Sequence, residues 1–154
     1  MGHNFEDGDL TEKIIGCAMK VHSQLGCGFQ EVIYQRALAK ELRKLSINFE
    51  REFEMTIYYD EEPIGSRRVD FLVENRISVE LKALTALEDI HLAQAKNYLE
   101  AYKLGVGLLI NFGWSRLEFK RVINSRAPIH RPSTPLPNSI RDIRPNPRHP
   151  GSDS

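Results

Sequence analysis

The stretch Val69–Ala83 reads VDFLVENRISVELKA, and it decides how this chain folds. Two runs rich in β-branched and aromatic residues flank a short polar break at 74–76, and this pattern predicts a β-hairpin. Because strand residues alternate between faces, the apolar residues of the second run face one way and Glu80 faces the other. Symmetric pairing about Asn75 then places Asp70 opposite Glu80, on the same face, with Cβ atoms about 4.5–5.5 Å apart.

Two carboxylates placed in this way predict a nearby positive charge. They repel each other unless a cation lies between them. Mg²⁺ is usually held by one or two carboxylates and several waters, so it would supply that charge. Lys82 follows Glu80 by two residues and shares its face. The group Asp70, Glu80 and Lys82 is therefore the candidate site that the hairpin predicts.

Length and composition indicate a soluble globular protein. The 154 residues suffice for one domain with a real core, and 41% hydrophobic with 27% charged residues is ordinary. No apolar run approaches the roughly 20 residues of a membrane helix. The polar, acidic N-terminus does not resemble a signal peptide. Cys17 and Cys27 form neither a zinc pattern nor a disulfide framework, so we expect reduced thiols in a cytoplasmic protein.

Charge and proline content divide the chain into unequal parts. The net charge is zero, which removes any global electrostatic argument for nucleic-acid binding. Seven of the eight prolines and five arginines follow Ser125, whereas residues 1–125 hold 16 basic and 19 acidic residues. We expect an N-terminal arm (1–8), a folded domain (9–125) and a disordered Pro/Arg-rich tail (126–154). The tail is either a solubilising terminus or a weak basic arm towards nucleic acid.

Two helices are predicted before the hairpin. A capping box at Asp9–Glu12, with Asp9 as its N-cap, and apolar residues at helical spacing from Leu10 predict a first helix that ends before Gly26. A second helix is expected over about 30–45. Glu31 precedes Tyr34 by three residues on its inward face, where a carboxylate must be paired, hydrogen-bonded or metal-bound. The alternative is an ordinary first-turn glutamate that points to solvent.

Further elements are read from the same periodicities. Residues 48–59 alternate as a half-solvated strand, with one apolar face made of Phe49, Phe53, Met55, Ile57 and Tyr59. A capping box at Thr85–Glu88 predicts a third helix over 86–104. The apolar run 106–112 is expected to be a strand covered on both faces, which completes a βαβ crossover, and 117–123 to be a last strand. The predicted inward side of the third helix carries Leu87, Ile90, Gln94, Tyr98 and Ala101.

Gln94 and Tyr98 lie four residues apart and are therefore neighbours on the surface of the third helix. Polar groups on an inward face indicate a functional site. The alternative is two side chains that satisfy each other at the margin of the core.

The order of these elements and motifs resembles the PD-(D/E)XK nuclease superfamily. More narrowly, the segment 28–34 (GFQEVIY) is similar to the signature of the bacterial GxxExxY family, and 93–99 (AQAKNYL) and 109–113 (LINFG) are similar to later parts of it. The resemblance implies an α/β fold of order α-α-β-β-β-α-β-β, a mixed β-sheet flanked by helices with a restriction-endonuclease-like core. One departure is Val69, which stands where the superfamily motif has proline.

This resemblance implies metal-dependent hydrolysis of phosphodiester bonds in DNA or RNA. Asp70 and Glu80, with the backbone carbonyl of Leu81, would hold Mg²⁺ or Mn²⁺. Glu31 would complete the metal shell or orient a water, and Lys82 would position the attacking water or stabilise developing charge. The supporting or substrate-contacting residues would be Gln94, Tyr98 and Tyr34.

Two other classes of function fit the same sequence. The fold can be a catalytically silent module that binds nucleic acid or a protein partner, which the neutral charge favours. It can also be a subunit of a homodimer or a larger complex, with the strand end at Tyr58 and Tyr59 as the surface to inspect.

Overall fold

The computed structural model describes residues 7–125 of the chain. Its elements, in chain order, are α1 (Asp7–Leu25), α2 (Glu31–Lys44), β1 (Phe49–Tyr59), β2 (Glu62–Val73), β3 (Ile77–Lys82), α3 (Asp89–Tyr102), β4 (Val106–Asn111) and β5 (Glu118–Ile123). The sheet has five strands in the order β1-β2-β3-β4-β5, antiparallel except for the parallel pair β3–β4. The predicted fold class and element order are confirmed. The predicted tail and most of the predicted N-terminal arm lie outside the described residues, and Asp7 and Gly8 belong to α1.

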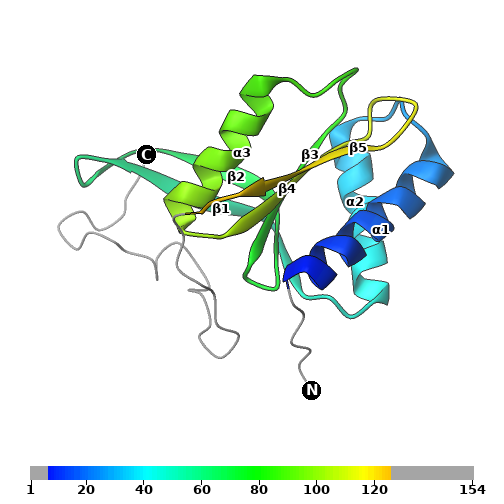
Figure 1. Cartoon of the computed structure of the whole chain (residues 1–154), viewed down its shortest axis with the longest axis horizontal. Coiled ribbons are helices and arrows are strands. Elements are labelled where there is room, and N and C mark those ends of the chain that lie inside the picture. Colours follow the sequence, from blue (N-terminus) through cyan, green and yellow to red (C-terminus); the bar gives the residue numbers. More distant parts are fainter. Residues whose placement is uncertain (1–6, 126–154) are drawn as a thin grey trace.

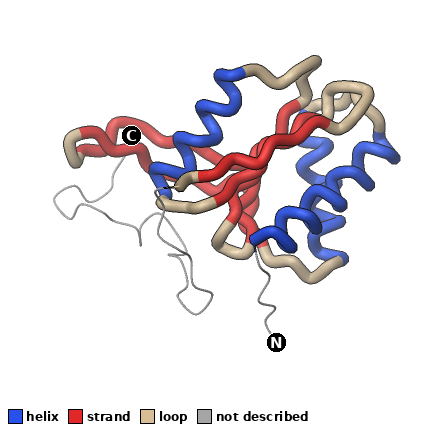
Figure 2. Tube along the Cα trace, in the orientation of Figure 1, coloured by secondary structure: helices blue, strands red, loops and turns tan. Residues whose placement is uncertain are grey.

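Helices cover both faces of the sheet (Figures 1 and 2). α1 and α2 pack on one face and α3 packs on the other, where it connects the parallel strands β3 and β4. Each face has its own apolar core. The α1/α2 core includes Leu10, Ile14, Tyr34, Leu38, Phe71, Val79, Leu81 and Phe112. The α3 core includes Phe53, Met55, Val69, Leu72, Tyr98, Leu99 and Val122. None of the described helices has both the length and the apolar character needed to span a bilayer.

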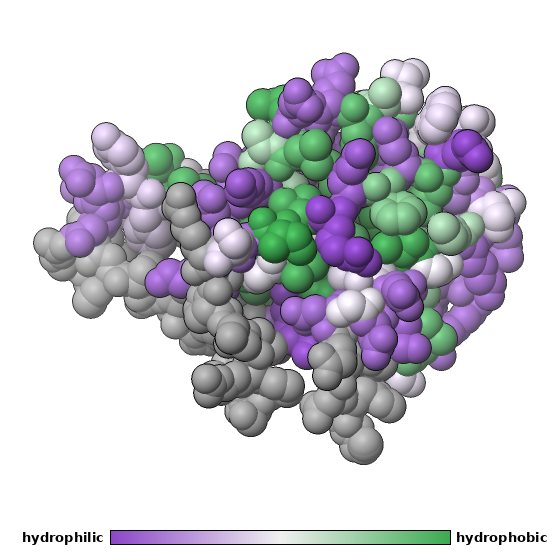
Figure 3. Space-filling model, viewed as in Figure 1, coloured by the Kyte–Doolittle hydropathy of each residue, from purple (hydrophilic) through white to green (hydrophobic). Residues whose placement is uncertain are grey.

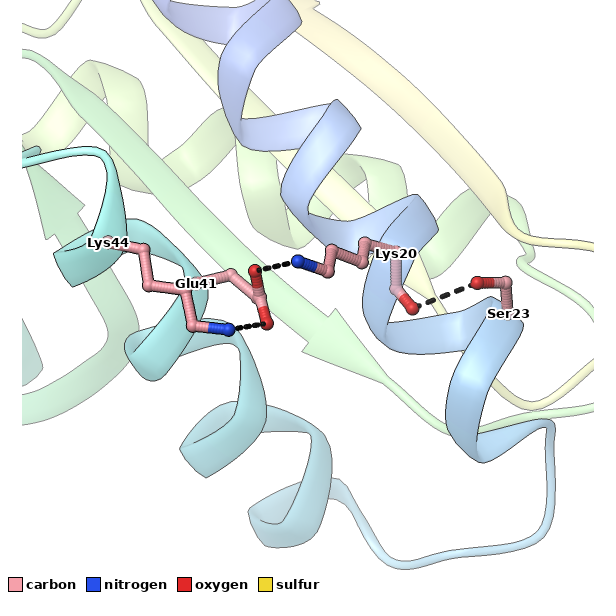
Figure 4. Close-up of polar contacts among 4 residues, drawn as sticks. All are labelled: Lys20, Ser23, Glu41 and Lys44. Carbon is pink, nitrogen blue, oxygen red and sulfur yellow. Dashed lines mark hydrogen bonds and ion pairs between the residues drawn. The ribbon is translucent and has the colours of Figure 1, made fainter.

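The pairing of α1 with α2 rests mainly on apolar burial. Figure 4 shows Glu41 of α2 between Lys20 of α1 and Lys44 of its own helix, at 3.3 and 3.2 Å. Both lysines are exposed, and ion pairs of this kind contribute about 0–1 kcal/mol each. Cys17 is buried in the α1/α2 core as a free thiol. His22 is buried too, and its Nε2 lies within hydrogen-bond distance of the Trp114 carbonyl oxygen, at 2.9 Å.

The central hairpin forms in the predicted register near its turn, but the predicted pairing of Asp70 with Glu80 is absent, because the register ends at Phe71 and Val79 and Asp70 accepts from the Leu81 amide instead. Val73 pairs with Ile77, Leu72 with Ser78 and Phe71 with Val79. The Arg76 amide donates to the Val73 carbonyl at 2.9 Å and closes the turn, in which Glu74 and Asn75 have φ angles of +52° and +56°. Asparagine tolerates this left-handed region better than most residues, so the polar break in the sequence does mark the turn.

Near Asp70, the odd-numbered side chains of β1 and β2 switch from one face of the sheet to the other. The prediction of a single apolar face for 48–59 is therefore wrong. Phe49 packs against Phe71 in the α1/α2 core, whereas Phe53 lies in the α3 core. Val69 also lies in the α3 core, two residues from Phe71 in the other core. The backbone reason is visible in β1, where Glu52 adopts a φ of +52° that strand alternation does not accommodate.

Both helix starts predicted from capping boxes are wrong. α1 already includes Asp7, so Asp9 lies inside the helix. α3 begins at Asp89, and its capping box is formed by Glu88 and His91. The segment before α3 is held out of the helix because backbone groups of Leu84 and the amide of Leu87 bond to side chains of β4 and β5.

The predicted inward side of α3 is also corrected. The buried residues of α3 are Ala95, Tyr98 and Leu99, whereas Ile90 is exposed. In β5 the buried residue is Val122, which faces the α3 core, while the other parity is exposed, with Phe119 at 38% and Ile123 at 53%. β5 is an edge strand, and Figure 3 shows apolar residues gathered near the middle of the viewed face, over this strand.

Candidate active site

Asp70 lies where β2 leaves β3. It is the residue next to Phe71, whose pairing with Val79 is the last of the hairpin register. Its Oδ2 accepts a hydrogen bond from the Leu81 amide at 2.7 Å, and its Oδ1 accepts one from Gln35 Nε2 at 2.9 Å. The carboxylate therefore fills the gap between the diverging strands. Burial raises the pKa of Asp70, and these two hydrogen bonds and the charge of Lys82 oppose that shift.

Glu80 lies on the face of β3 that α3 covers, and it is 5% exposed. Burial raises the pKa of this carboxyl group, and hydrogen bonding with the Tyr98 hydroxyl and the charges of Lys82 and Arg67 oppose the shift. The charge of Asp70 adds to the increase. Glu80 Oε1 is buried without a hydrogen-bond partner among residues 7–125. An unpaired buried carboxylate oxygen is costly, and a bound cation would satisfy it.

Tyr98 of α3 approaches Glu80 from the face of the sheet that α3 covers. Its hydroxyl donates to the Arg68 carbonyl at 3.1 Å, and the Arg67 guanidinium carbon lies 4.6 Å from the ring centroid, a cation–π distance. Burial and the charge of Glu80 raise the pKa of Tyr98. Gln94 lies one turn earlier and is half-buried. The Tyr98 hydroxyl thus bonds to β2, which disfavours the reading of Gln94 and Tyr98 as a pair that only satisfies itself.

Two further charged residues of the site are Glu31, at the start of α2, and Lys82, at the end of β3. Glu31 is the first residue of α2, and burial raises its carboxyl pKa, while the charge of Lys82 and a hydrogen bond with the Ala83 backbone lower it. The Lys82 ammonium acts electrostatically on Glu31, Asp70 and Glu80. Glu31 was predicted to be either an inward carboxylate with a partner or an ordinary glutamate that points to solvent. The structure combines the two, because the residue is exposed, yet its carboxylate faces Lys82 and Ala83.

The donor set allows a cation but does not form a complete cage. Within residues 7–125, no group of three or more His, Cys, Asp or Glu side chains is placed so that it could hold a metal ion. Glu31, Asp70 and Glu80 are therefore not drawn together into a shell of three carboxylates. Asp70 and Glu80 nevertheless fit a divalent cation, because desolvation raises the pKa of both carboxyl groups and Glu80 keeps an unpaired oxygen. Mg²⁺ requires no more than one or two carboxylates.

Tyr34 does not join the carboxylates through its hydroxyl. The side chain is fully buried, its ring stacks on Phe112 at 4.6 Å, and its hydroxyl donates to the Gly26 carbonyl at 2.5 Å. The same oxygen accepts from the Phe29 amide at 3.2 Å. Tyr34 thus anchors the loop that leads into α2, and its support of the site is indirect, through the placement of Glu31.

Two residues of the site were missed by the sequence reasoning. Gln35 is 5% exposed and joins Arg51 to Asp70, because its Oε1 accepts from Arg51 Nε at 3.0 Å and from Nη2 at 2.5 Å. A signal was present in the strand: Arg51 is a lone charge between Phe49 and Phe53, at the parity predicted to be apolar. Such a residue needs a buried partner, but spacing within the strand does not say which.

The comparisons with known proteins agree with this architecture. A family model described as the PD-(D/E)XK nuclease superfamily matches residues 8–122. Among solved structures the chain is similar to the one titled "Crystal structure of SSO0001", with a TM-score of 0.50 and 20% sequence identity over 65% of this chain and 52% of that chain. The chain thus spans about half the length of that structure, and the likeness bears on the fold. No curated protein matches the sequence.

Proposed function

The chain belongs to the PD-(D/E)XK nuclease superfamily, and we propose from this premise that it hydrolyses phosphodiester bonds in DNA or RNA with the help of Mg²⁺ or Mn²⁺. One observation carries the proposal: half-buried Asp70 and buried Glu80 lie within the electrostatic reach of Lys82, and Glu80 keeps a carboxylate oxygen that no described residue satisfies. A merely structural core would gain stability by replacing these charges with apolar groups.

In this proposal Asp70 and Glu80 hold the cation, together with the backbone carbonyl of Leu81. When bound, the metal lowers the pKa of a water and neutralises charge on the phosphate. Asp70 is oriented for this task, because the Leu81 amide and Gln35 fix its two oxygens at 2.7 and 2.9 Å.

Lys82 supplies positive charge where the phosphate gains negative charge in the transition state. Glu31 faces Lys82 from the start of α2 and orients a water or adds a ligand to the metal shell. Tyr98 and Gln94 support the site from α3: the Tyr98 hydroxyl donates to the Arg68 carbonyl of β2, and its proximity to Glu80 lowers the pKa of that carboxyl group against the larger effect of burial.

The finer assignments are part of the same proposal. Membership of the GxxExxY family is supported by Gly28, Glu31 and Tyr34 at the required spacing. A folded nuclease unit at 9–125, a nucleic-acid partner and a homodimer or larger complex remain predictions. So does a cytoplasmic location.

The direct test is cleavage of a mixed panel of DNA and RNA with Mg²⁺ or Mn²⁺. We expect the wild-type protein to cut, and Asp70→Ala and Lys82→Ala to lose at least about 100-fold in rate, as expected when a group that stabilises the transition state is removed. Lys40→Ala is the matched control, since Lys40 is an exposed lysine of α2. Equal cleavage by all four proteins would exclude the assignment.

The second candidate is a catalytically silent module that binds nucleic acid. The lack of a three-ligand metal group within 7–125 and the zero net charge favour it. It predicts binding that weakens with salt, no turnover with either metal, and no effect of Asp70→Ala on affinity. A filter-binding titration at two salt concentrations, run beside the cleavage assay, separates the two functions.

A further inference from the structure

A chain of hydrogen bonds leads from Arg51 to the candidate metal ligand Asp70. Arg51 of β1 donates through Nε and Nη2 to Gln35 Oε1, and Gln35 Nε2 donates to Asp70 Oδ1. On its other side, Asp70 Oδ2 accepts from the Leu81 amide. These hydrogen bonds therefore connect β1, α2, β2 and β3, and Gln35 lies almost fully buried at their centre.

We propose that Gln35 and Arg51 are positioning residues that fix the orientation of the Asp70 carboxylate while leaving its negative charge available to a cation. This inference rests on the proposed function. An amide has one accepting and one donating end, so it bonds to a guanidinium on one side and a carboxylate on the other.

The inserted amide has a consequence that a direct contact would not have. Arg51 in direct contact with Asp70 would form a charge-assisted pair, frequently bidentate, and the guanidinium would compete with a metal for the same oxygens. With Gln35 between them, Arg51 instead fixes which end of the Gln35 side-chain amide faces Asp70. Each Asp70 oxygen accepts one protein hydrogen bond and retains a further lone pair.

The faces of the strands explain why such a device is needed at this position. Val69 and Phe71 lie in different cores, so neither core packs around the intervening Asp70 and fixes its side chain. Hydrogen bonds from α2 and β3 replace that packing. Removal of the hydrogen-bond partner behind a metal ligand typically reduces metal affinity 10- to 100-fold.

The first test requires no metal. In the wild-type protein the Leu81 amide is protected by Asp70, so its hydrogen exchange reports the orientation of that carboxylate. We expect Gln35→Ala and the near-isosteric Gln35→Glu to accelerate exchange at Leu81 by about tenfold, the equivalent of one weakened hydrogen bond. The Leu84 amide, bonded to Asn111 Oδ1 at 2.8 Å, is the internal control and should be unchanged.

The second test is Mn²⁺ binding by calorimetry on the same proteins. Gln35→Glu and Arg51→Met should weaken Mn²⁺ binding by roughly 10- to 100-fold, and Arg51→Lys should recover part of the loss. Arg43→Met is the matched control, because Arg43 also links α2 to β1, over the Phe49 ring at 5.3 Å, and has no hydrogen bond to Gln35. It should bind Mn²⁺ as the wild type does.

The outcomes separate this inference from the proposed function. Unchanged Leu81 exchange and unchanged Mn²⁺ affinity in Gln35→Glu would overturn the positioning role. Absence of Mn²⁺ binding by the wild type would count against the proposed function, and the exchange measurement would still decide whether Gln35 orients Asp70.

Discussion

Glu80 is a residue that folding alone does not favour. Its carboxylate is buried between β3 and α3, its pKa is raised by that burial, and its Oε1 has no hydrogen-bond partner in the described part of the chain. Each of these features reduces the stability of the metal-free protein. A residue kept under such conditions is typical of a functional site, where stability and activity oppose each other.

Replacing this charge by a neutral isostere should therefore stabilise the metal-free protein. We expect Glu80→Gln to increase the free energy of unfolding by on the order of 1 kcal/mol at pH 8 in the presence of a chelator. Chemical denaturation followed by circular dichroism measures this change. Glu12→Gln, on the exposed face of α1, is the control and should have little effect. A less stable Glu80→Gln protein would contradict the view that Glu80 is unfavourably buried.

At the residue scale, spacing along the chain was sufficient for groups that lie close in sequence. Asp70, Glu80 and Lys82 belong to one hairpin, so the turn at Asn75 brings them within electrostatic reach of one another, although strand alternation wrongly paired Asp70 with Glu80. Gln35 and Arg51 could not be found in this way. Their contact joins a helix, an edge strand and Asp70, and no periodicity within one element encodes it.

A buried side chain of β4, Asn111, fixes the start of the segment between β3 and α3. Asn111 Oδ1 accepts from the amides of Leu84 and Gly113 at 2.8 and 3.1 Å. Its Nδ2 donates to the Leu84 carbonyl and to Glu118 Oε1, both at 3.0 Å. All the donors and acceptors of the amide are used, so the residues that follow Lys82 are held in one conformation.

Gly113 allows this close approach, and a methyl group there should disrupt it. A Cβ at position 113 would lie 2.3 Å from the backbone nitrogen and oxygen of Leu84. We expect Gly113→Ala to reduce the free energy of unfolding by about 1–3 kcal/mol, because backbone atoms must move. Gly16→Ala is the control: nothing lies within 4 Å of its Cβ, and it should stabilise α1 by about 0.5–1 kcal/mol. Thermal denaturation of the two variants should shift in opposite directions.

The same segment explains why one helix start was predicted wrongly. Thr85–Glu88 fits a capping box by sequence, but Leu84 and Leu87 are bonded to β4 and β5, which keeps 84–87 out of α3. The helix begins instead at Asp89, with the box formed by Glu88 and His91. Tertiary hydrogen bonds from distant strands decide between two local signals, and only the fold supplies them.

Over the whole molecule, element order followed from the sequence but the path of the sheet did not. Period-two and helical patterns predicted the eight elements in order. The change of faces in β1 and β2 depends on the positive φ of Glu52 and on which helix covers each part of the hairpin. That change matters for function, because it brings Asp70 between the two cores, within reach of α2 and β3.

Carboxyl groups of raised pKa should make the stability of the metal-free protein depend on pH. The pKa values of Asp70, Glu80 and Glu31 are raised by burial, so the folded state binds protons more tightly than the unfolded state does. Their contribution to stability is greatest below the ordinary carboxyl range near pH 4 and falls as pH rises through the raised values. Glu41 acts oppositely: although desolvation raises its pKa, hydrogen bonds from Lys44 and Lys20 lower it overall. Its contribution is lost as pH falls.

The difference between two proteins isolates the contribution of one acid from this sum. The stability advantage of Glu80→Gln over the wild type should be small near pH 4, should grow as pH rises through the raised pKa of Glu80, and should then level off. Denaturation curves in chelator at half-unit steps from pH 4 to pH 8 measure it. An advantage that is constant across this range would show that Glu80 titrates alike in the folded and unfolded states.

A divalent cation should reverse this cost, and the reversal should itself depend on pH. A ligand that binds only the folded protein stabilises it by about 2.7 kcal/mol at 100 times its dissociation constant. Carboxylates bind metal when deprotonated, so the increase in melting temperature on adding Mn²⁺ should be largest near pH 8 and should disappear as Glu80 and Asp70 become protonated. Glu80→Gln should lose most of the response, whereas Glu41→Gln, which changes an ion pair between α1 and α2, should retain it. A response that is equal in both variants would place the cation elsewhere, because only Glu80 contributes a buried, unpaired carboxylate oxygen among residues 7–125.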